Sequence, residues 1–125
     1  MNLLISVPSR LGRASLRNTK LDNADLSNAN LVEAKLQNAS LRGTLLSHAS
    51  LHGANLSGAN LTYTNFYSAD LSFSVLIDIQ NDIQDGQKYN FICKKANFRN
   101  AVINDVELEE YLKKNDAKNI PTTIS

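Results

Sequence analysis

The chain has 125 residues, of which 42% are hydrophobic, as expected for one small soluble domain. Its 13 basic and 12 acidic residues give a formal net charge of +1 and are mixed along the chain, so we expect neither a nucleic acid nor an acidic substrate as a partner. The single Cys93 excludes an internal disulfide, and no Cys/His cluster has zinc spacing, which favours a reducing, cytoplasmic compartment.

Residues 1–8 lack the basic start and the long apolar run of a signal peptide. No stretch of the chain is long and apolar enough to span a membrane, and we expect no membrane partner. Leu3, Leu4, Ile5 and Val7 precede the repeating pattern described next, and we predict that they form an extended N-terminal cap over its open end. The alternative is a homodimer contact through the same terminal cap.

From residue 9 to residue 78 a large apolar residue recurs every five positions, fourteen times without a miss, and a small residue lies two positions before each one. A period of five fits neither an α-helix nor a flat strand. All the large residues can point inward only if the chain turns once every five residues and coils around its own axis. We therefore predict that they are the centres of a narrow core: Leu11, Leu16, Leu21, Leu26, Leu31, Leu36, Leu41, Leu46, Leu51, Leu56, Leu61, Phe66, Leu71 and Leu76.

The repeats resemble the pentapeptide-repeat family, whose pattern A-(D/N)-L-x-x is matched by Ala24-Asp25-Leu26, Ala29-Asn30-Leu31, Ala54-Asn55-Leu56 and Ala59-Asn60-Leu61. The resemblance implies an all-β solenoid, a right-handed quadrilateral β-helix with four pentapeptides and twenty residues to a coil. On that geometry, residues twenty apart are neighbours on one face. Two exposed ion pairs are then expected, Asp22 with Arg42 and Arg13 with Glu33.

The pattern stops after Asp78, and residues 79–95 form an interruption with a turn signal at Asp85-Gly86. It resumes over residues 96–104, where Phe98 and Ile103 are further core centres. Because Leu76 and Phe98 are 22 positions apart, the interruption either adds two residues to a coil or forms a protruding loop.

Several outward positions in the last coil before the interruption carry large apolar side chains, where earlier coils carry mostly polar ones. They are Tyr63, Tyr67, Phe73, Val75 and Ile77. We favour the interpretation that the interruption folds back on them through Tyr89 and Phe91. The alternative is an exposed patch that binds a partner.

A short C-terminal α-helix is predicted over residues 105–114. Asn104 and Glu107 stand at capping-box spacing, and Leu108, Tyr111 and Leu112 form one apolar stripe. The stripe is expected to cover the open end of the last coil. Residues 115–125 are polar and are expected to be a flexible tail.

No catalytic, cofactor-binding or metal-binding constellation is found. His48 and His52 flank one corner of the coil, but their stacked neighbours offer no third ligand or orienting acid. We therefore expect a non-enzymatic protein that binds an unidentified protein partner as an interaction or regulatory module. The alternative is a structural spacer without a specific partner.

The resemblance also raises a third possibility, because some members of the family bind DNA gyrase by imitating duplex DNA. Such a mimic needs a long rod with a continuous acidic surface. Residues 9–78 carry six basic and five acidic residues, which disfavours it.

Overall fold

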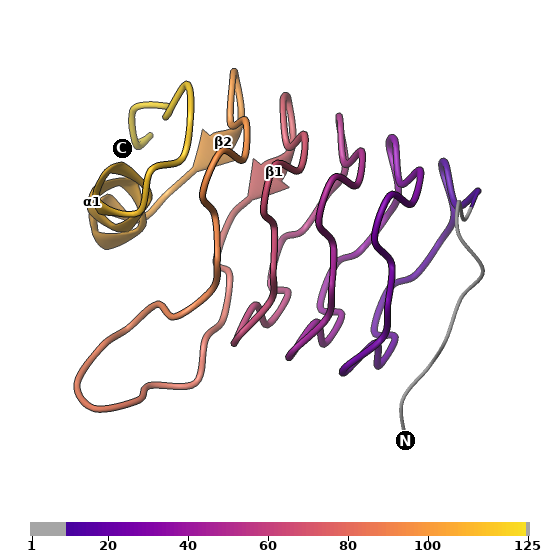
Figure 1. The fold of residues 1–125 in the computed structure, drawn as a ribbon, viewed down its shortest axis with the longest axis horizontal. Coiled ribbons are helices and arrows are strands. Elements are labelled where there is room, and N and C mark those ends of the chain that lie inside the picture. The colour runs from indigo at the N-terminus through magenta and orange to yellow at the C-terminus, as the bar shows by residue number, and fades with distance from the viewer. Residues whose placement is uncertain (1–9, 125) are drawn as a thin grey trace.

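The chain folds into a right-handed quadrilateral β-helix, seen in a computed structural model that describes residues 10–124 (Figure 1). Parallel bridges join residues twenty positions apart, from Arg10–Asn30 through Asn60–Gln80. This spacing confirms the twenty-residue coil. The predicted N-terminal cap, and with it the terminal dimer contact, lies outside the described residues.

Each five-residue side of the coil contributes one inward centre, one small inward residue and one sharp corner. The corner residue, two positions after the centre, has a positive φ, such as 60° at Asn23 and 64° at Gly43. Asn and Gly are common there because they tolerate the left-handed conformation that other residues adopt at a cost. The predicted centres from Leu21 to Leu76, with Phe98 and Ile103, are at most 2% exposed, whereas Leu11 and Leu16 in the first coil are partly buried.

Regular strands are very short because each side of a coil contributes only one or two ladder residues. β1 (Val75–Leu76) and β2 (Val102–Ile103) pair in parallel, Val75 with Val102 and Leu76 with Ile103. The other ladder steps are isolated bridges.

The interruption is a protruding loop, which was one of the two predicted forms (Figure 1). After Gln80, bridged residues are 27 positions apart instead of 20, as in Asn65–Ile92 and Asp70–Asn97. Seven residues are therefore inserted into one coil.

The repeat register resumes one repeat earlier than predicted. Because Ile92 pairs with Asn65, Cys93 takes the centre position above Phe66, and Phe91 takes the small position above Thr64. The large and small residues are exchanged in this repeat. The fixed order of a small residue before a large centre is therefore absent here, and for this reason the sequence predicts a boundary at residue 96.

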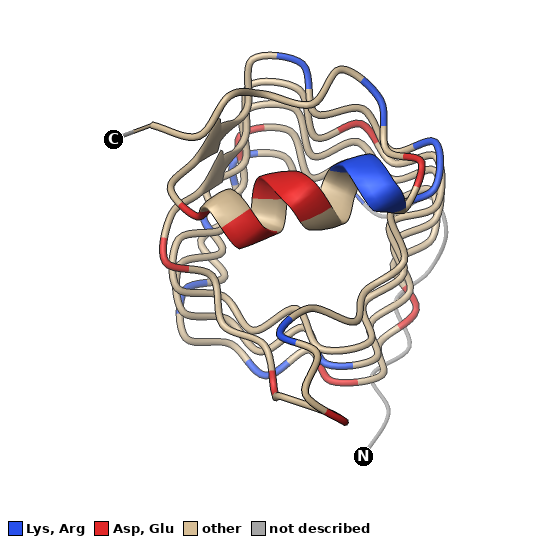
Figure 2. Cartoon of the chain, turned by 90° about the vertical axis from the view of Figure 1, so that its left-hand side faces the viewer, with Lys and Arg blue, Asp and Glu red and all other residues tan. Residues whose placement is uncertain are grey.

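The C-terminal helix α1 (Val106–Lys114) lies across the open end of the last coil (Figure 2). Leu108 and Leu112 are fully buried, and the Tyr111 hydroxyl donates to the Phe91 carbonyl at 2.7 Å. The predicted N-cap at Asn104 is wrong by one residue. Asp105 caps the helix by accepting a hydrogen bond from the Glu107 N–H at 3.0 Å.

Residues 115–124 follow the last coil, where a flexible tail was expected. Lys118 pairs in parallel with Asn97, and its N–H donates to the Ala96 carbonyl at 2.8 Å. Farther on, the Ile124 N–H donates to the Ile103 carbonyl at 3.0 Å. This segment therefore covers part of the coil edge that α1 leaves open.

Candidate functional site

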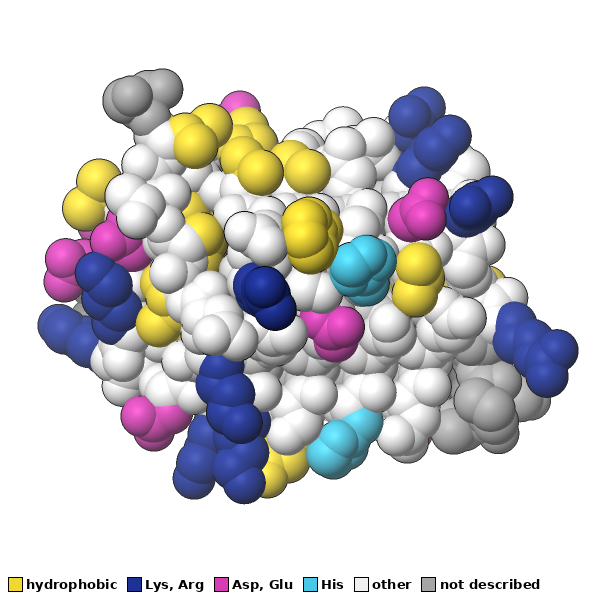
Figure 3. Space-filling view, turned by 90° about the horizontal axis from the view of Figure 1, so that it is seen from above, with side chains coloured by type: hydrophobic (Ala, Val, Ile, Leu, Met, Phe, Trp, Pro, Cys, Tyr) yellow, Lys and Arg dark blue, Asp and Glu magenta, His cyan; other side chains and the backbone are white. Residues whose placement is uncertain are grey.

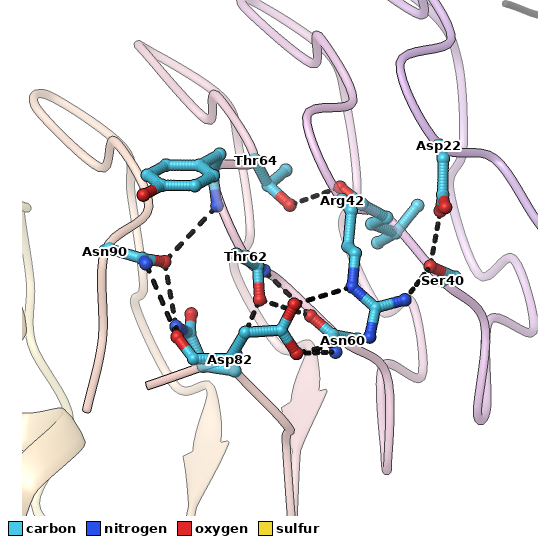
Figure 4. A network of polar contacts seen from close by, with 11 residues as sticks. Asp22, Ser40, Arg42, Asn60, Thr62, Thr64, Asp82 and Asn90 are labelled. Carbon is cyan, nitrogen blue, oxygen red and sulfur yellow. Dashed lines mark hydrogen bonds and ion pairs between the residues drawn. The ribbon is translucent and has the colours of Figure 1, made fainter. Parts of the chain in front are cut away.

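The inserted loop is tied to the coil at its first end by Asp82 (Figure 4). The Arg42 guanidinium donates to both carboxylate oxygens of Asp82, from Nε at 2.8 Å and from Nη2 at 3.2 Å, and Asn60 Nδ2 donates at 3.2 Å. The Asp82 N–H donates to Thr62 Oγ1 at 2.7 Å. The hydrogen bonds from Arg42 and Asn60 hold the pKa of Asp82 below its ordinary value.

This anchor replaces one of the ion pairs expected from stacking. Asp22 does not pair with Arg42; it accepts a hydrogen bond from the Ser40 hydroxyl instead. Arg42 instead donates two hydrogen bonds to the loop residue Asp82, 40 positions later in the chain, and its Nη1 donates to the Ser40 hydroxyl at 3.2 Å.

The other expected pair is confirmed. Arg13 Nε lies 3.6 Å from the Glu33 carboxylate, with side chains 81% and 53% exposed. An ion pair this open to solvent adds little to stability.

At its second end the loop is tied to the helix cap. The Asp105 carboxylate accepts hydrogen bonds from the Tyr89 hydroxyl and from Lys88 Nζ, the latter at 2.7 Å. Burial raises the pKa of Asp105, but the hydrogen bonds from Lys88, Tyr89 and the Glu107 N–H outweigh it and leave the pKa below its ordinary value. One carboxylate thus holds the loop and caps α1, with both of its oxygens engaged.

The neck of the loop is closed by a third set of contacts. Asn81 Nδ2 donates to Asn90 Oδ1 at 2.8 Å, which joins the two chain segments that enter and leave the loop. The same oxygen accepts the Tyr63 N–H at 3.3 Å (Figure 4). The neck of the loop therefore contacts the corner of the coil at Tyr63.

The tip of the loop is a tight hairpin. Gln84 and Gln87 form an antiparallel bridge, and between them Asp85 and Gly86 have φ of 49° and 77°. Positive φ at both central residues is typical of the type I′ turn that Asp-Gly favours. Ile83, next to this turn, is 70% exposed.

The five predicted outward residues do not form one patch. Tyr63 is 58% exposed and Phe73 is 53% exposed. Tyr63 and Phe73 are corner residues with positive φ, whereas Tyr67 and Ile77 each lie one position before a corner, so the side chains are spread around one coil. We call Tyr63 together with residues 80–88, which are at least partly exposed, the loop surface.

The loop does not cover the five outward residues, so the expectation that it folds back on them through Tyr89 and Phe91 is wrong. Tyr89 and Phe91 are 3% and 2% exposed and belong to the core. The Phe91 ring packs 5.0 Å from Tyr111 and 5.9 Å from Phe66, between centroids. They therefore fill the space between the last coil and α1, and Tyr63 and Phe73 remain open to solvent.

The two histidines and the single cysteine, the side chains most often used in catalysis or metal binding, each contact ordinary packing or hydrogen-bond partners. His48 packs edge-on against Tyr67 with ring centroids 5.6 Å apart, and His52 Nδ1 lies 2.8 Å from the Ser72 hydroxyl, its predicted stacked neighbour. Cys93 is buried, and burial together with the charge of Asp116 raises its pKa to about 12, so the thiol stays protonated. Across residues 10–124, no three His, Cys, Asp or Glu side chains are grouped to hold a metal ion.

An open groove of about 500 Å³ separates the loop from α1. Gln87 and Tyr89 line one side, and Val106, Glu110 and Tyr111 line the other. Val106 is 62% exposed. No helix in the described part of the chain has the length and hydropathy needed to cross a membrane.

Eight copies of the pentapeptide-repeat model match residues 9–47 and 39–76, more than half of the chain. The chain belongs to the pentapeptide-repeat family. No curated protein matches this pentapeptide-repeat chain.

Solved structures of other pentapeptide-repeat proteins are similar to it. A protein from the thylakoid lumen of Arabidopsis thaliana is 25% identical, with a TM-score of 0.58 over 91% of this chain and 78% of that one. Rfr23 from the cyanobacterium Cyanothece 51142 is 35% identical, with a TM-score of 0.50 over 65% of this chain and 57% of that one.

Proposed function

We propose that this pentapeptide-repeat protein is a non-enzymatic module that binds another protein through the loop surface, and that the coil is the scaffold that holds this surface. The observation that carries the proposal is the hairpin at residues 83–87, which is anchored at both ends and leaves Ile83 70% exposed. A large apolar side chain on a surface loop is a common protein contact.

Anchoring supports this role because it lowers the entropy lost on binding. Asp82 is held by Arg42 and Asn60, and Tyr89 is held by Asp105. A loop already fixed in one conformation loses little freedom when a partner docks, so more of the contact energy remains as affinity.

The conformation of Tyr63 supports it as well. Tyr63 has a φ of 56° at a corner where Asn or Gly would be less strained, and its ring is 58% exposed. Because the Tyr63 ring is largely exposed, burying it offsets little of the free energy that the positive φ costs. Phe73 has a similar conformation and exposure, so what distinguishes Tyr63 is its position beside the loop, where its N–H donates to Asn90 Oδ1 at 3.3 Å.

The test is affinity capture from the native host, with the intact protein and three variants as bait. Ile83→Ser removes the apolar tip, and Tyr63→Asn replaces the ring with a residue suited to positive φ. Phe73→Asn is the matched control, because Phe73 is 53% exposed with a φ of 59° at another corner of the same coil. Circular dichroism checks that each variant is folded.

We expect one protein to be captured by the wild type and by Phe73→Asn in equal yield, and at least about tenfold less by Ile83→Ser and Tyr63→Asn, since a central interface residue is worth 1–2 kcal/mol or more. Loss of capture in Phe73→Asn alone would move the binding site to that corner and contradict the proposal. Equal capture by all four proteins would show that the loop surface does not bind the partner, and would also contradict the proposal. A chain that captures nothing specific would support the structural-spacer alternative.

A further inference from the structure

The charges of the solenoid are sorted along its axis, although the counts for the whole chain are nearly balanced. Residues 10–49, the first two coils, carry six basic and three acidic side chains. Residues 50–69, the third coil, carry none. Residues 70–124 carry nine acidic and seven basic side chains. Both signs occur in each charged segment, and the excess of basic residues lies at the N-terminal end.

Four cations ring the first coil. Arg10 and Lys20 occupy outward ladder positions on opposite sides, where they pair with Asn30 and Ser40, and Arg13 and Arg17 lie between them. All four are exposed. Figure 3 shows basic side chains at the N-terminal end of one face, next to an acidic one.

The acidic residues of this coil follow the four cations in the sequence. Asp22 lies on the same side as Lys20 and accepts from the Ser40 hydroxyl, and Asp25 lies on the fourth side and accepts from the Ser27 N–H at 3.0 Å. We call Arg10, Arg13, Arg17 and Lys20 the basic rim. It runs over three of the four sides with no acidic residue between its members in the sequence, and Arg13 is paired with Glu33 of the next coil.

Among the residues that the structure describes, the basic rim surrounds the end of the core that is less covered than the rest. Leu11 and Leu16 are only partly buried, whereas the centres of the later coils are at most 2% exposed. An apolar centre with cations around it is the arrangement of surfaces that rest in the headgroup region of an anionic bilayer. Residues 10–29 contain no aromatic side chain on which a base could stack, so a single-stranded nucleic acid fits less well.

We propose that the N-terminal end of the solenoid docks on an anionic membrane surface, with the basic rim against lipid phosphates and carboxylates. This reverses the expectation from sequence that the protein has no membrane partner. It is independent of the loop surface, which lies at the other end of the coil, so a docked molecule would still present the loop to a protein partner.

The test is co-sedimentation at low salt with vesicles of phosphatidylcholine, alone or with about a third of phosphatidylserine. We expect the full-length protein to bind only the anionic vesicles and to be released by about 1 M salt, where the Debye length falls to about 3 Å. The variant Arg10→Gln/Arg17→Gln/Lys20→Gln should bind about 100-fold more weakly, because each basic residue near such a surface is worth about a factor of five.

The matched control is Lys94→Gln/Arg99→Gln/Lys114→Gln, which removes three exposed positive charges near the other end and leaves the same net charge. We expect it to bind as the wild type does, with circular dichroism showing that both variants are folded. Equal binding to neutral and anionic vesicles, or equal loss in both triple variants, would overturn the proposal. So would tighter binding of a labelled DNA duplex than of vesicles at the same salt, or salt-sensitive self-association that the basic-rim variant abolishes.

Discussion

Leu41 lies in the middle of the repeat block and is fully buried, and no charged side chain is among the buried residues of the described chain. Leu41→Asp should unfold the coil, because an unpaired carboxylate in such a core costs several kcal/mol. The neighbouring Arg42→Ala loses an ion pair whose side chains are 46% and 42% exposed, so its expected cost is about 0–1 kcal/mol. Thermal melts followed by circular dichroism distinguish the two, and a native melt for Leu41→Asp would show that the assigned register is wrong.

Phe91 and Cys93 test the exchanged repeat. Phe91→Ala should cost about 3–5 kcal/mol by leaving a cavity between Phe66 and Tyr111, and Cys93→Leu should cost about 1–3 kcal/mol by overpacking. The double variant restores the usual small-then-large order, so its cost should fall below the sum of the single costs by more than about 1 kcal/mol. Denaturant titration of all four proteins measures this coupling. Strictly additive costs would mean that the two side chains do not share one space.

At this scale the sequence predicted most of the core and little of the loop. The centres from Leu21 to Leu76 were identifiable because large and small residues alternate in one fixed order. Phe91 and Cys93 reverse that order, so their signal was absent. The contact between Arg42 and Asp82 spans two coils and an insertion, and stacking by twenty residues predicts Asp22 as the partner of Arg42 instead.

At the scale of elements, α1 and the segment after it are joined by Glu109. Its carboxylate accepts the Thr123 N–H and hydroxyl, both at 2.7 Å, and Lys113 Nζ at 2.9 Å. The hydrogen bonds from Lys113 and Thr123 lower the pKa of Glu109 from 4.5 to about 2. A lowered pKa means that the ionised carboxylate stabilises this contact above the ordinary pKa, and that the stabilisation is lost as the pH falls toward 2.

We therefore expect the protection of the Thr123 amide against hydrogen exchange to decrease between about pH 4.5 and pH 2. Glu109→Gln should show low protection already at neutral pH and little further change in this range. Protection factors, corrected for the intrinsic exchange rate, make the comparison. A wild-type amide that keeps its protection at pH 2 would show that Glu109 does not hold residue 123.

The helix was predictable from local signals and the segment after it was not. The stripe of Leu108, Tyr111 and Leu112 has helical spacing, and charged residues follow the order that the helix dipole favours. The start was displaced by one residue because Asn104 and Asp105 are both good N-caps, and Asn104 Nδ2 donates instead to the Asp78 carboxylate at 2.8 Å. Residues 115–124 follow the coil through backbone groups, for which no side-chain pattern gives a signal.

At the scale of the molecule, the two ends of the solenoid differ in covering as well as in charge. The first coil leaves Leu11 and Leu16 partly exposed inside the basic rim. The last coil is covered by α1 and is edged by residues 115–124 (Figures 1 and 2). Head-to-tail stacking would have to displace α1, so the covered end limits open-ended assembly.

Truncation after Asn104 tests this directly, because it removes α1 and the segment that pairs Lys118 with Asn97. The truncated chain exposes core residues that Leu108 and Leu112 now cover, together with an unpaired backbone edge, and should associate as its concentration rises. Light scattering over a dilution series measures the association, with circular dichroism to show that the coil is folded. A second chain that ends at Asn115 keeps α1 and should associate less, since only one edge is opened. If the chain truncated at Asn104 is no more associated than the full-length protein, α1 does not protect this end from association. The packing of α1 would then contribute only to the stability of the last coil.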